Sequence, residues 1–251
     1  MDFSIKGKKA IITGGARGIG KSVAVAFVQA GADVAIVDID IDEASKTVSE
    51  LAAMGGRAIA VGTDVTDPDQ VNMMVSEVKS AFGRIDICFN NAGASCNEPA
   101  EDMAYASWLK IIDLNLNAAF LVAQAVGRVM IAQGSGSIIN TASMSAHIVN
   151  QPQPQCAYNA AKAAVIQLTK SLAVEWVQRG VRVNSISPGY ISTDMTLGAP
   201  AEWKERWMDL SPAKRMGTPE ELTGAVVYLA SDAASFTTGT DIIIDGAFVC
   251  K

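Results

Sequence analysis

Tyr158 and Lys162 form a pair of side chains whose chemistry could transfer a proton. They are four positions apart at the predicted start of a helix, so both side chains lie on one helical face. An ammonium beside a phenol favours the phenolate and lowers a pKa that is about 10 in an unperturbed tyrosine. The pair therefore predicts an acid/base group near neutral pH. Taken singly, the two residues are also ordinary in helices, so the prediction needs further residues.

Ser143 supplies a third candidate group. It lies within an uncharged stretch, residues 129–161, which Lys162 ends and which we expect to be buried. It also lies at the carboxyl end of the fifth predicted strand, at the edge of a parallel sheet where ligands bind. Its hydroxyl could hold a carbonyl oxygen.

A glycine-rich turn, Thr13-Gly14-Gly15-Ala16-Arg17-Gly18-Ile19-Gly20, lies between the first predicted strand and helix. Such a turn brings the backbone close to a pyrophosphate, and the helix N-terminus adds N–H donors and partial positive charge. The spacing departs from the standard G-x-G-x-x-G, and a purely structural turn could have the same residues. Its place after a strand and before a helix favours nucleotide binding.

Asp38 ends the second strand, eighteen residues after Gly20. A carboxylate there can accept hydrogen bonds from both ribose hydroxyls of an adenosine and repels a 2′-phosphate. We therefore predict NAD, with NADP less favoured. Alternatively, Asp38 caps the next helix together with Asp40 and Asp42. Arg17 opposes the prediction, because its guanidinium could bind a 2′-phosphate.

Short β-branched runs alternate with longer amphipathic stretches along the chain. Strands are expected at residues 8–13, 33–37, 57–61, 85–90, 136–143, 181–187 and 240–245. Helices are expected to end near Ala30, Met54 and Phe82 and to occupy 105–133, 158–179 and 218–231, with Gly31 as a C-cap, Asp40 and Thr66 as N-caps and Pro68 in a first turn.

Strands joined by crossover helices run parallel, with helices on both faces of the sheet. The sequence thus predicts an α/β fold, a single Rossmann-type doubly wound domain over residues 1–251 with a seven-stranded parallel sheet. The irregular segments 93–104, 144–157 and 189–217 are where we expect function.

Composition argues against several classes of function. The formal net charge of -6 disfavours nucleic-acid binding. One histidine, His147, and four cysteines without a C-x-x-C pair disfavour a catalytic zinc, so no metal is predicted. The N-terminal residues lack an apolar signal core, and no run of about 18 apolar residues suggests a bilayer span. We therefore expect a cytoplasmic protein that does not enter a membrane.

Six parts of the chain together resemble the motif set of the classical short-chain dehydrogenase/reductases. They are the glycine turn, Asn90-Asn91-Ala92-Gly93, Asn115, Ser143, Tyr158-Asn159-Ala160-Ala161-Lys162 and Pro188-Gly189. The resemblance covers nearly the whole chain and implies an NAD(P)-dependent oxidoreductase. By the same resemblance Tyr158 transfers the proton, Ser143 polarises the substrate oxygen, Lys162 binds the nicotinamide ribose and lowers the tyrosine pKa, and Asn115 holds a water in a proton relay.

The resemblance also implies further cofactor contacts and a homotetramer. Asp64 and Val65 would contact the adenine, and Asn91 and Gly93 would line the cofactor cleft. The complete predicted cofactor set is Gly14, Arg17, Gly18, Ile19, Gly20, Asp38, Asp64, Val65, Asn91, Gly93, Tyr158, Lys162, Pro188, Gly189, Ile191 and Thr193, of which Pro188, Gly189 and Thr193 would meet the nicotinamide end.

The segment 144–157 is rich in neutral hydrogen-bonding side chains, which suit a polyhydroxylated substrate better than an acyl chain. A solvated loop is the alternative. This segment and residues 183–195 resemble the sugar-alcohol branch of the family, the mannitol, arabinitol and sorbose/sorbitol dehydrogenases. The predicted substrate residues are Ser145, His147, Gln153 and Tyr190. Trp203 and Trp207, four apart, could form a lid over the site or could pack in a core or subunit contact.

Two other functions remain open. A 3-oxoacyl-carrier-protein reductase using NADPH shares the catalytic motifs, but Asp38 disfavours NADPH and the net charge of -6 suits an acidic carrier poorly. Its only clustered basic candidates are Lys204, Arg206, Lys214 and Arg215. A non-catalytic nucleotide sensor is the other possibility, and the intact Ser143, Tyr158 and Lys162 argue against it.

Overall fold

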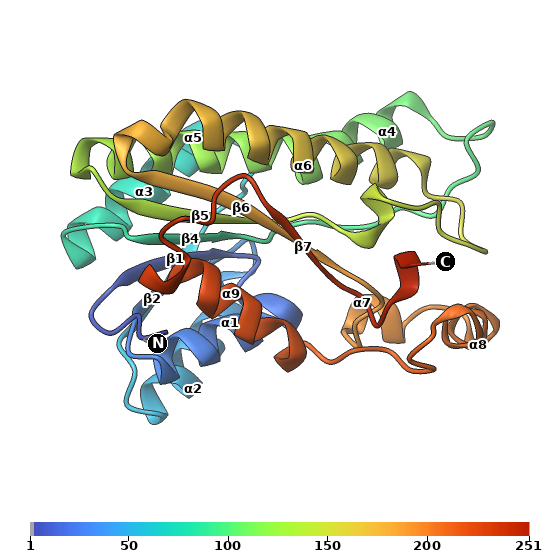
Figure 1. Ribbon diagram of the computed structural model, residues 1–251, viewed down its shortest axis with the longest axis horizontal. Helices are drawn as coiled ribbons and strands as arrows, with labels where there is room; N and C mark the ends of the chain where they lie inside the picture. Colours follow the sequence, from blue (N-terminus) through green and yellow to red (C-terminus); the bar gives the residue numbers. More distant parts are fainter. Residues whose placement is uncertain (1–2, 251) are drawn as a thin grey trace.

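A seven-stranded parallel sheet runs through the centre of the protein, in a computed structural model that describes residues 3–250 (Figure 1). The strand order is β3-β2-β1-β4-β5-β6-β7, with every neighbouring pair parallel. The strands are β1 (Lys9–Thr13), β2 (Asp33–Asp38), β3 (Ala58–Gly62), β4 (Ile87–Asn90), β5 (Gly136–Thr141), β6 (Val181–Pro188) and β7 (Asp241–Ile244). The predicted fold class is confirmed.

Helices cover both faces of this sheet (Figure 1). One layer contains α3 (Pro68–Phe82), α5 (Ala118–Gln133) and α6 (Cys156–Trp176); the other contains α1 (Gly18–Gln29), α2 (Ile41–Ala53) and α9 (Glu220–Ala230). Alternate strand residues enter the two layers: Ile11 packs toward the first and Ile12 toward the second. Both faces are buried, which is why the strands are nearly continuous apolar runs.

Local hydrogen bonds set the helix ends. Asp40 caps α2 as predicted, accepting from the Glu43 amide at 3.1 Å. The predicted cap at Thr66 is wrong: the N-cap of α3 is Asp67, whose Oδ1 accepts from the amide of Asp69 at 2.9 Å. The Thr66 hydroxyl instead donates to Asp64. A carboxylate accepts two amide hydrogens more readily than a hydroxyl, so the aspartate takes the cap position.

The predicted helix 105–133 is interrupted. It consists of α4 (Tyr105–Ile112), a π-helical turn at Asp113–Asn117 and α5. By length and composition alone, Tyr105–Gln133 could cross a membrane, although it contains no continuous apolar run of about 18 residues. In the fold its apolar residues, Val122 and Val126 among them, are buried in the core between this helix and the sheet. The apolar character is that of a core helix.

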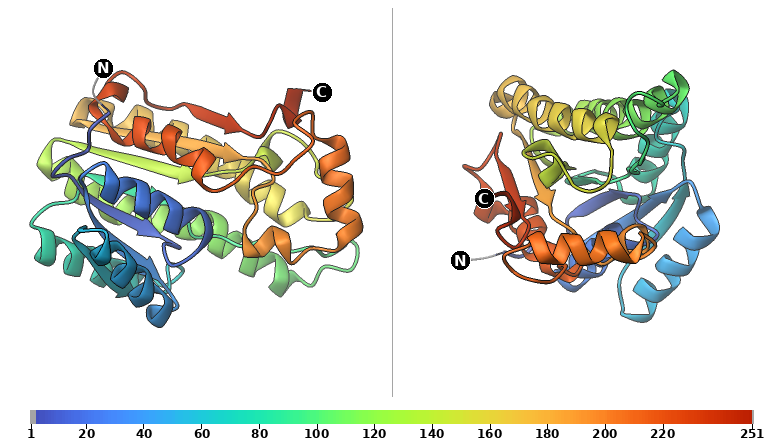
Figure 2. Two further views of the ribbon diagram at one scale, coloured as in Figure 1. Left: turned by 90° about the horizontal axis from the view of Figure 1, so that it is seen from below. Right: turned by 90° about the vertical axis from the view of Figure 1, so that its right-hand side faces the viewer.

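The carboxyl ends of the strands point toward two short helices (Figure 2). These are α7 (Asp194–Leu197) and α8 (Ala201–Leu210), within a segment that the sequence predicted to be irregular. A 3-10 turn at Met144–Ala146 follows β5, and α6 begins at Cys156, two residues earlier than predicted. Further 3-10 turns span Val177–Arg179, Asp232–Ala234 and Phe248–Cys250. The segments expected to carry function thus gather at one end of the sheet.

Candidate active site

A cleft of about 490 Å³ lies at the carboxyl end of the sheet. Its walls come from the glycine turn, from the ends of β4, β5 and β6, and from α6, α7 and α8. The structure brings most of the predicted site residues to it: Gly14, Arg17, Gly18, Ile19, Asn91, Gly93, Asn115, Ser143, Ser145, Gln153, Tyr158, Lys162, Pro188, Gly189, Tyr190, Ile191 and Thr193.

The glycine turn depends on glycine at particular positions. Gly14 and Gly18 have φ values of +60° and +53°, which side chains rarely allow. A Cβ at Gly20 would lie 2.1 Å from the carbonyl oxygen of Gly14. Gly20 therefore shapes the turn from behind rather than lining the cleft. The turn leaves its backbone and the N-terminus of α1 open to a ligand, a geometry that fits a pyrophosphate.

Asn115 lies in the π-helical turn and points an oxygen into the site. Its Nδ2 donates to the carbonyl oxygens of Ala94 at 2.8 Å and Ile111 at 3.0 Å, so both amide hydrogens are used. Its Oδ1 is buried without a partner. A Cβ at Gly93 would lie 2.7 Å from this oxygen and 3.3 Å from Lys162 Nζ. An acceptor and an ammonium therefore face the same small space beside Gly93, which suits a bridging water.

Lys162 is buried beneath this space. Its Nζ donates to the carbonyl oxygen of Thr141, at the end of β5, at 2.8 Å. Burial lowers the pKa of Lys162 to about 8. The Nζ also lies 5.5 Å from the centre of the Tyr158 ring, which places it under the face of the phenol.

Tyr158 and Ser143 meet across the cleft floor. The 3-10 turn holds Ser143, whose Oγ accepts from the Ser145 amide at 3.1 Å and donates to Ser145 Oγ at 3.0 Å. Burial raises the pKa of Tyr158, and its hydrogen bond with Ser143 only partly opposes this. The lowered pKa expected from the sequence is therefore wrong for this structure, because loss of water disfavours the phenolate.

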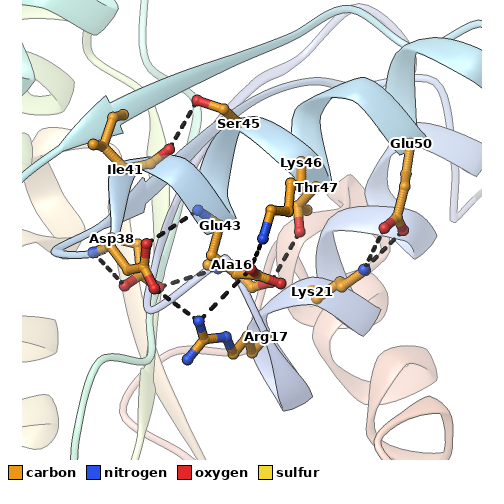
Figure 3. Close-up of polar contacts among 11 residues, drawn as sticks. Ala16, Arg17, Lys21, Asp38, Ile41, Glu43, Ser45, Lys46, Thr47 and Glu50 are labelled. Carbon is orange, nitrogen blue, oxygen red and sulfur yellow. Dashed lines mark hydrogen bonds and ion pairs between the residues drawn. The ribbon is translucent and has the colours of Figure 1, made fainter.

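Charged side chains gather at the end of the cleft where α1 and α2 begin. Asp38 lies behind the cleft wall, where its carboxylate accepts from the amides of Ala16 at 3.1 Å and Asp40 at 3.2 Å. The Arg17 guanidinium reaches from the start of α1 to the first turn of α2, beside Glu43 (Figure 3). It pairs with Asp40 at 2.7 Å and lies 3.7 Å from Glu43. The two residues with opposite implications for the cofactor thus belong to one cluster.

The predicted adenine contacts lie outside the cleft wall. The Asp64 carboxylate accepts from the amide and the hydroxyl of Thr66 at 2.9 and 2.7 Å. Val65 is buried in the core. Asn91, by contrast, connects the end of β4 to the glycine turn, since its Nδ2 donates to the carbonyl oxygens of Thr13 and Gly14.

Three of the four predicted substrate residues come together. Ser145, Gln153 and Tyr190 line the cleft near Ser143. His147 does not: its Nε2 lies 2.8 Å from Oδ2 of Asp241 in β7. Asp241 also accepts from the hydroxyls of Ser185 and Ser187 at 2.6 and 2.8 Å. His147 therefore attaches its turn to the sheet edge instead of facing the cleft.

Comparison with known proteins gives the family. A family model described as enoyl-(acyl carrier protein) reductase matches residues 14–248. A crystal structure of a short-chain type dehydrogenase/reductase from Mycobacterium marinum superposes with a TM-score of 0.97 at 46% identity, covering 99% of this chain and 98% of that one. The chain belongs to the short-chain dehydrogenase/reductase family. It is an oxidoreductase that acts on CH–OH groups.

Two curated relatives of this short-chain dehydrogenase/reductase are sugar enzymes. The chain is 48% identical to a sorbose reductase of Candida albicans over 99% of its length and 89% of the relative. It is 47% identical to a probable NADP-dependent mannitol dehydrogenase of Yarrowia lipolytica, over 99% and 90% of the two chains. The predicted resemblance to the polyol branch is confirmed at this level.

Three residues that line the cleft of this short-chain dehydrogenase/reductase are absent from the predicted site set. Asn150, Gln155 and Trp207 all line the cleft. The first two belong to the polar segment that was predicted to face substrate. Trp207 was considered only as a lid or packing residue, yet it is buried and hydrogen-bonded within the site. The four-residue spacing with Trp203 gave its helical face but not its polar partner.

Proposed function

We propose that this protein interconverts a sugar alcohol and its ketose, using NAD(H). The main support is the neutral polar wall of Ser145, Asn150, Gln153 and Tyr190 beside Ser143 and Tyr158. Such a wall hydrogen-bonds hydroxyl groups without requiring a charged substrate. The names of the sorbose reductase and mannitol dehydrogenase relatives agree with it.

In this proposal Ser143 and Tyr158 handle the reacting oxygen. During oxidation Ser143 donates a hydrogen bond to that oxygen, and Tyr158 removes its proton as the base. A nicotinamide bound in the cleft supplies the hydride acceptor for oxidation and the hydride donor for reduction. The glycine turn and the N-terminus of α1 would hold its pyrophosphate, and Lys162 and Thr193, which line the cleft, would hold its ribose and amide.

Lys162 and Asn115 would return the proton to solvent. The ammonium and the unpartnered Asn115 oxygen face one space beside Gly93, so a water there bridges them. The ammonium also stabilises negative charge that develops on Tyr158. Each group in this proposed sequence is positioned by backbone carbonyls, of Thr141 for the lysine and of Ala94 and Ile111 for the asparagine.

We propose NAD rather than NADP for an electrostatic reason. The first turn of α2 presents Asp40 and Glu43 beside Asp38, and these carboxylates already engage Arg17. A 2′-phosphate would have to displace them from the guanidinium and then lie among the carboxylates. The Yarrowia relative carries NADP in its name, which makes a paired cofactor assay essential.

The test is a set of initial rates of reduced-cofactor formation across C4–C6 sugar alcohols, each with NAD and with NADP. Turnover with NAD supports the proposal in full. Turnover with NADP alone supports the proposed substrate and refutes the proposed preference for NAD. No turnover of any sugar alcohol, together with NADPH oxidation in the presence of an acetoacetyl thioester, refutes the proposed substrate class and favours a 3-oxoacyl-carrier-protein reductase. The homotetramer, the cytoplasmic location and the single-domain organisation stay predictions.

A further inference from the structure

A chain of buried side-chain hydrogen bonds connects α8 to the turn that carries Ser143. Trp207 Nε1 donates to Gln153 Oε1 at 2.9 Å, and Gln153 Nε2 lies 2.9 Å from the Tyr190 hydroxyl. The Tyr190 and Trp207 rings stack with centres 4.2 Å apart at 11°. The Gln153 and Trp207 side chains are 5% and 4% exposed, so water does not compete for these bonds.

The direction of each bond in this chain follows from the tryptophan. An indole N–H can only donate, so the facing atom of Gln153 must be its oxygen. The amide nitrogen of Gln153 therefore faces Tyr190 and donates to it. The orientation of this glutamine is fixed by its neighbours, without a charge anywhere in the chain.

A second amide fixes the other side of the same hydroxyl. Asn150 Nδ2 donates to Tyr190 Oη at 3.1 Å, while Asn150 Oδ1 accepts from Gln155 Nε2 at 2.9 Å. A hydroxyl has two acceptor sites and one hydrogen. Two amides fill the acceptor sites of Tyr190, so only its O–H hydrogen remains available, and Tyr190 lines the cleft.

We propose that Tyr190 acts as a fixed hydrogen-bond donor to a second oxygen of the substrate, and that Gln153 is the positioning residue that keeps it a donor. This inference rests on the proposed function, because the second oxygen is a hydroxyl neighbouring the carbinol that reacts at Ser143 and Tyr158. The group selects alcohols with an oxygen beyond the reacting carbon over alcohols without one. Burial raises the pKa of Tyr190, so the donor keeps its proton across the working range.

The experiment compares 2,3-butanediol with 2-butanol, which differ by one hydroxyl, alongside the best sugar alcohol from the substrate panel. The readout is the ratio of kcat/KM for the diol to that for the monoalcohol. Tyr190→Phe removes the donor and keeps the ring stack, so this ratio falls about tenfold, because the diol loses a hydrogen bond that 2-butanol never makes. In the same variant, kcat/KM for the sugar alcohol falls together with kcat/KM for the diol.

Gln153→Glu tests the positioning role. An ionised carboxylate accepts from both Trp207 and Tyr190, which turns the phenol hydrogen away from the cleft. The selectivity ratio then falls as pH rises and the introduced carboxylate ionises, and the double variant with Tyr190→Phe loses no more than Tyr190→Phe alone. Gln151→Glu is the matched control, since it makes the same charge change at an exposed position of the same segment. It keeps the wild-type ratio at every pH.

The outcomes separate this inference from the function beneath it. A wild-type protein that turns over neither sugar alcohols nor the diol refutes the proposed function and this inference together. Wild-type turnover with an unchanged ratio in Tyr190→Phe refutes the inference alone. Losses that multiply in the double variant show that Gln153 acts independently of Tyr190 and refute the positioning role. NAD binding and thermal unfolding midpoints of the variants are measured alongside, so that a folding defect is recognised as such.

Discussion

The two ends of the cleft differ in the charge and burial of the side chains that form them. At the end proposed to hold the ribose, Arg17, Asp40 and Glu43 form a partly exposed cluster of charges on side chains that can change rotamer. At the end proposed to hold the substrate, called the substrate end below, Gln153, Tyr190 and Trp207 form a buried network of neutral hydrogen bonds. Exposed ion pairs contribute about 0–1 kcal/mol and rearrange easily, whereas a buried polar group left without its partner costs about 1–3 kcal/mol. We therefore expect the charged cluster to adapt to its ligand and the neutral network to select its ligand.

The largest effect should come from the reacting group at the substrate end. Tyr158→Phe removes the acid/base hydroxyl but keeps the ring above Lys162, so kcat should fall by at least about 10²–10⁴-fold. NAD affinity, measured by protein fluorescence quenching, should change little because the ring and the glycine turn remain. Near-normal turnover in this variant would refute the catalytic assignment.

Lys162→Met should lower activity and raise stability at the same time. Burial lowers the lysine pKa from 10.5 to about 8, so the unfolded chain binds more protons between these values. The free energy of unfolding of the wild type should therefore rise relative to that of the variant from pH 8 to pH 10.5. Below pH 8 the buried charge of Lys162 should destabilise the folded wild type by its full amount, about 3 kcal/mol. The lost hydrogen bond to Thr141 offsets about 1 kcal/mol of the gain at pH 7.

Urea unfolding of both proteins at pH 7 and pH 10 measures this difference. A difference between the two proteins that does not change with pH would contradict the lowered pKa.

The pH dependence of the wild-type reaction should differ between its two directions. The pKa of Tyr158 is raised by burial, and oxidation needs the phenolate. The kcat/KM for oxidation should therefore increase about tenfold per pH unit below that pKa, while ketose reduction, which needs the phenol, persists at neutral pH. Parallel pH profiles of both directions with one substrate pair measure it, and an oxidation rate already level at neutral pH would be inconsistent with a raised pKa.

Trp207→Phe tests the contribution of α8 to the neutral hydrogen-bond network. Phenylalanine can still stack on Tyr190, but Gln153 Oε1 loses its donor in a buried position. We expect a loss of about 1–3 kcal/mol in the free energy of unfolding and a lower selectivity for polyols. Trp203→Phe is the control, because Trp203 is half-buried and does not line the cleft. Equal losses in the two variants would show that ring size rather than the N–H matters.

Arg17→Ala should have the smallest effect on stability, within about 0.5 kcal/mol, because the Arg17 side chain is 57% exposed. Its effect should appear in cofactor choice, as a further loss of kcat/KM with NADP and little change with NAD. Asp38→Asn, which should narrow the preference for NAD, provides the comparison. An Arg17→Ala variant that loses NAD-dependent activity instead would place the guanidinium on the pyrophosphate.

Regular periodicity made most of this fold predictable. The apolar runs and crossover helices determine the sheet, and the cleft position follows from its topology. The interruption at Asp113–Asn117 was not predictable, because a π turn depends on what Asn115 contacts in three dimensions rather than on local propensity. His147 was misplaced for a similar reason: its partner, Asp241, lies in the last strand. The helix α7 has too few turns to show a period, whereas the four-residue spacing of Trp203 and Trp207 indicated the helical face of α8.

The exposed charges around Arg17 make ionic strength a means of control over one end of the cleft. At physiological concentration, salt screens interactions between exposed charges beyond about 8 Å. Buried hydrogen bonds between neutral groups hardly respond to the salt concentration. The ratio of NAD to NADP use should therefore drift as potassium chloride is varied in the assay, while the ranking of sugar alcohols stays in place. If the proposed function holds, a change in the salt concentration of the cell would shift the balance between NAD and NADP use and leave the selection among sugar alcohols unchanged.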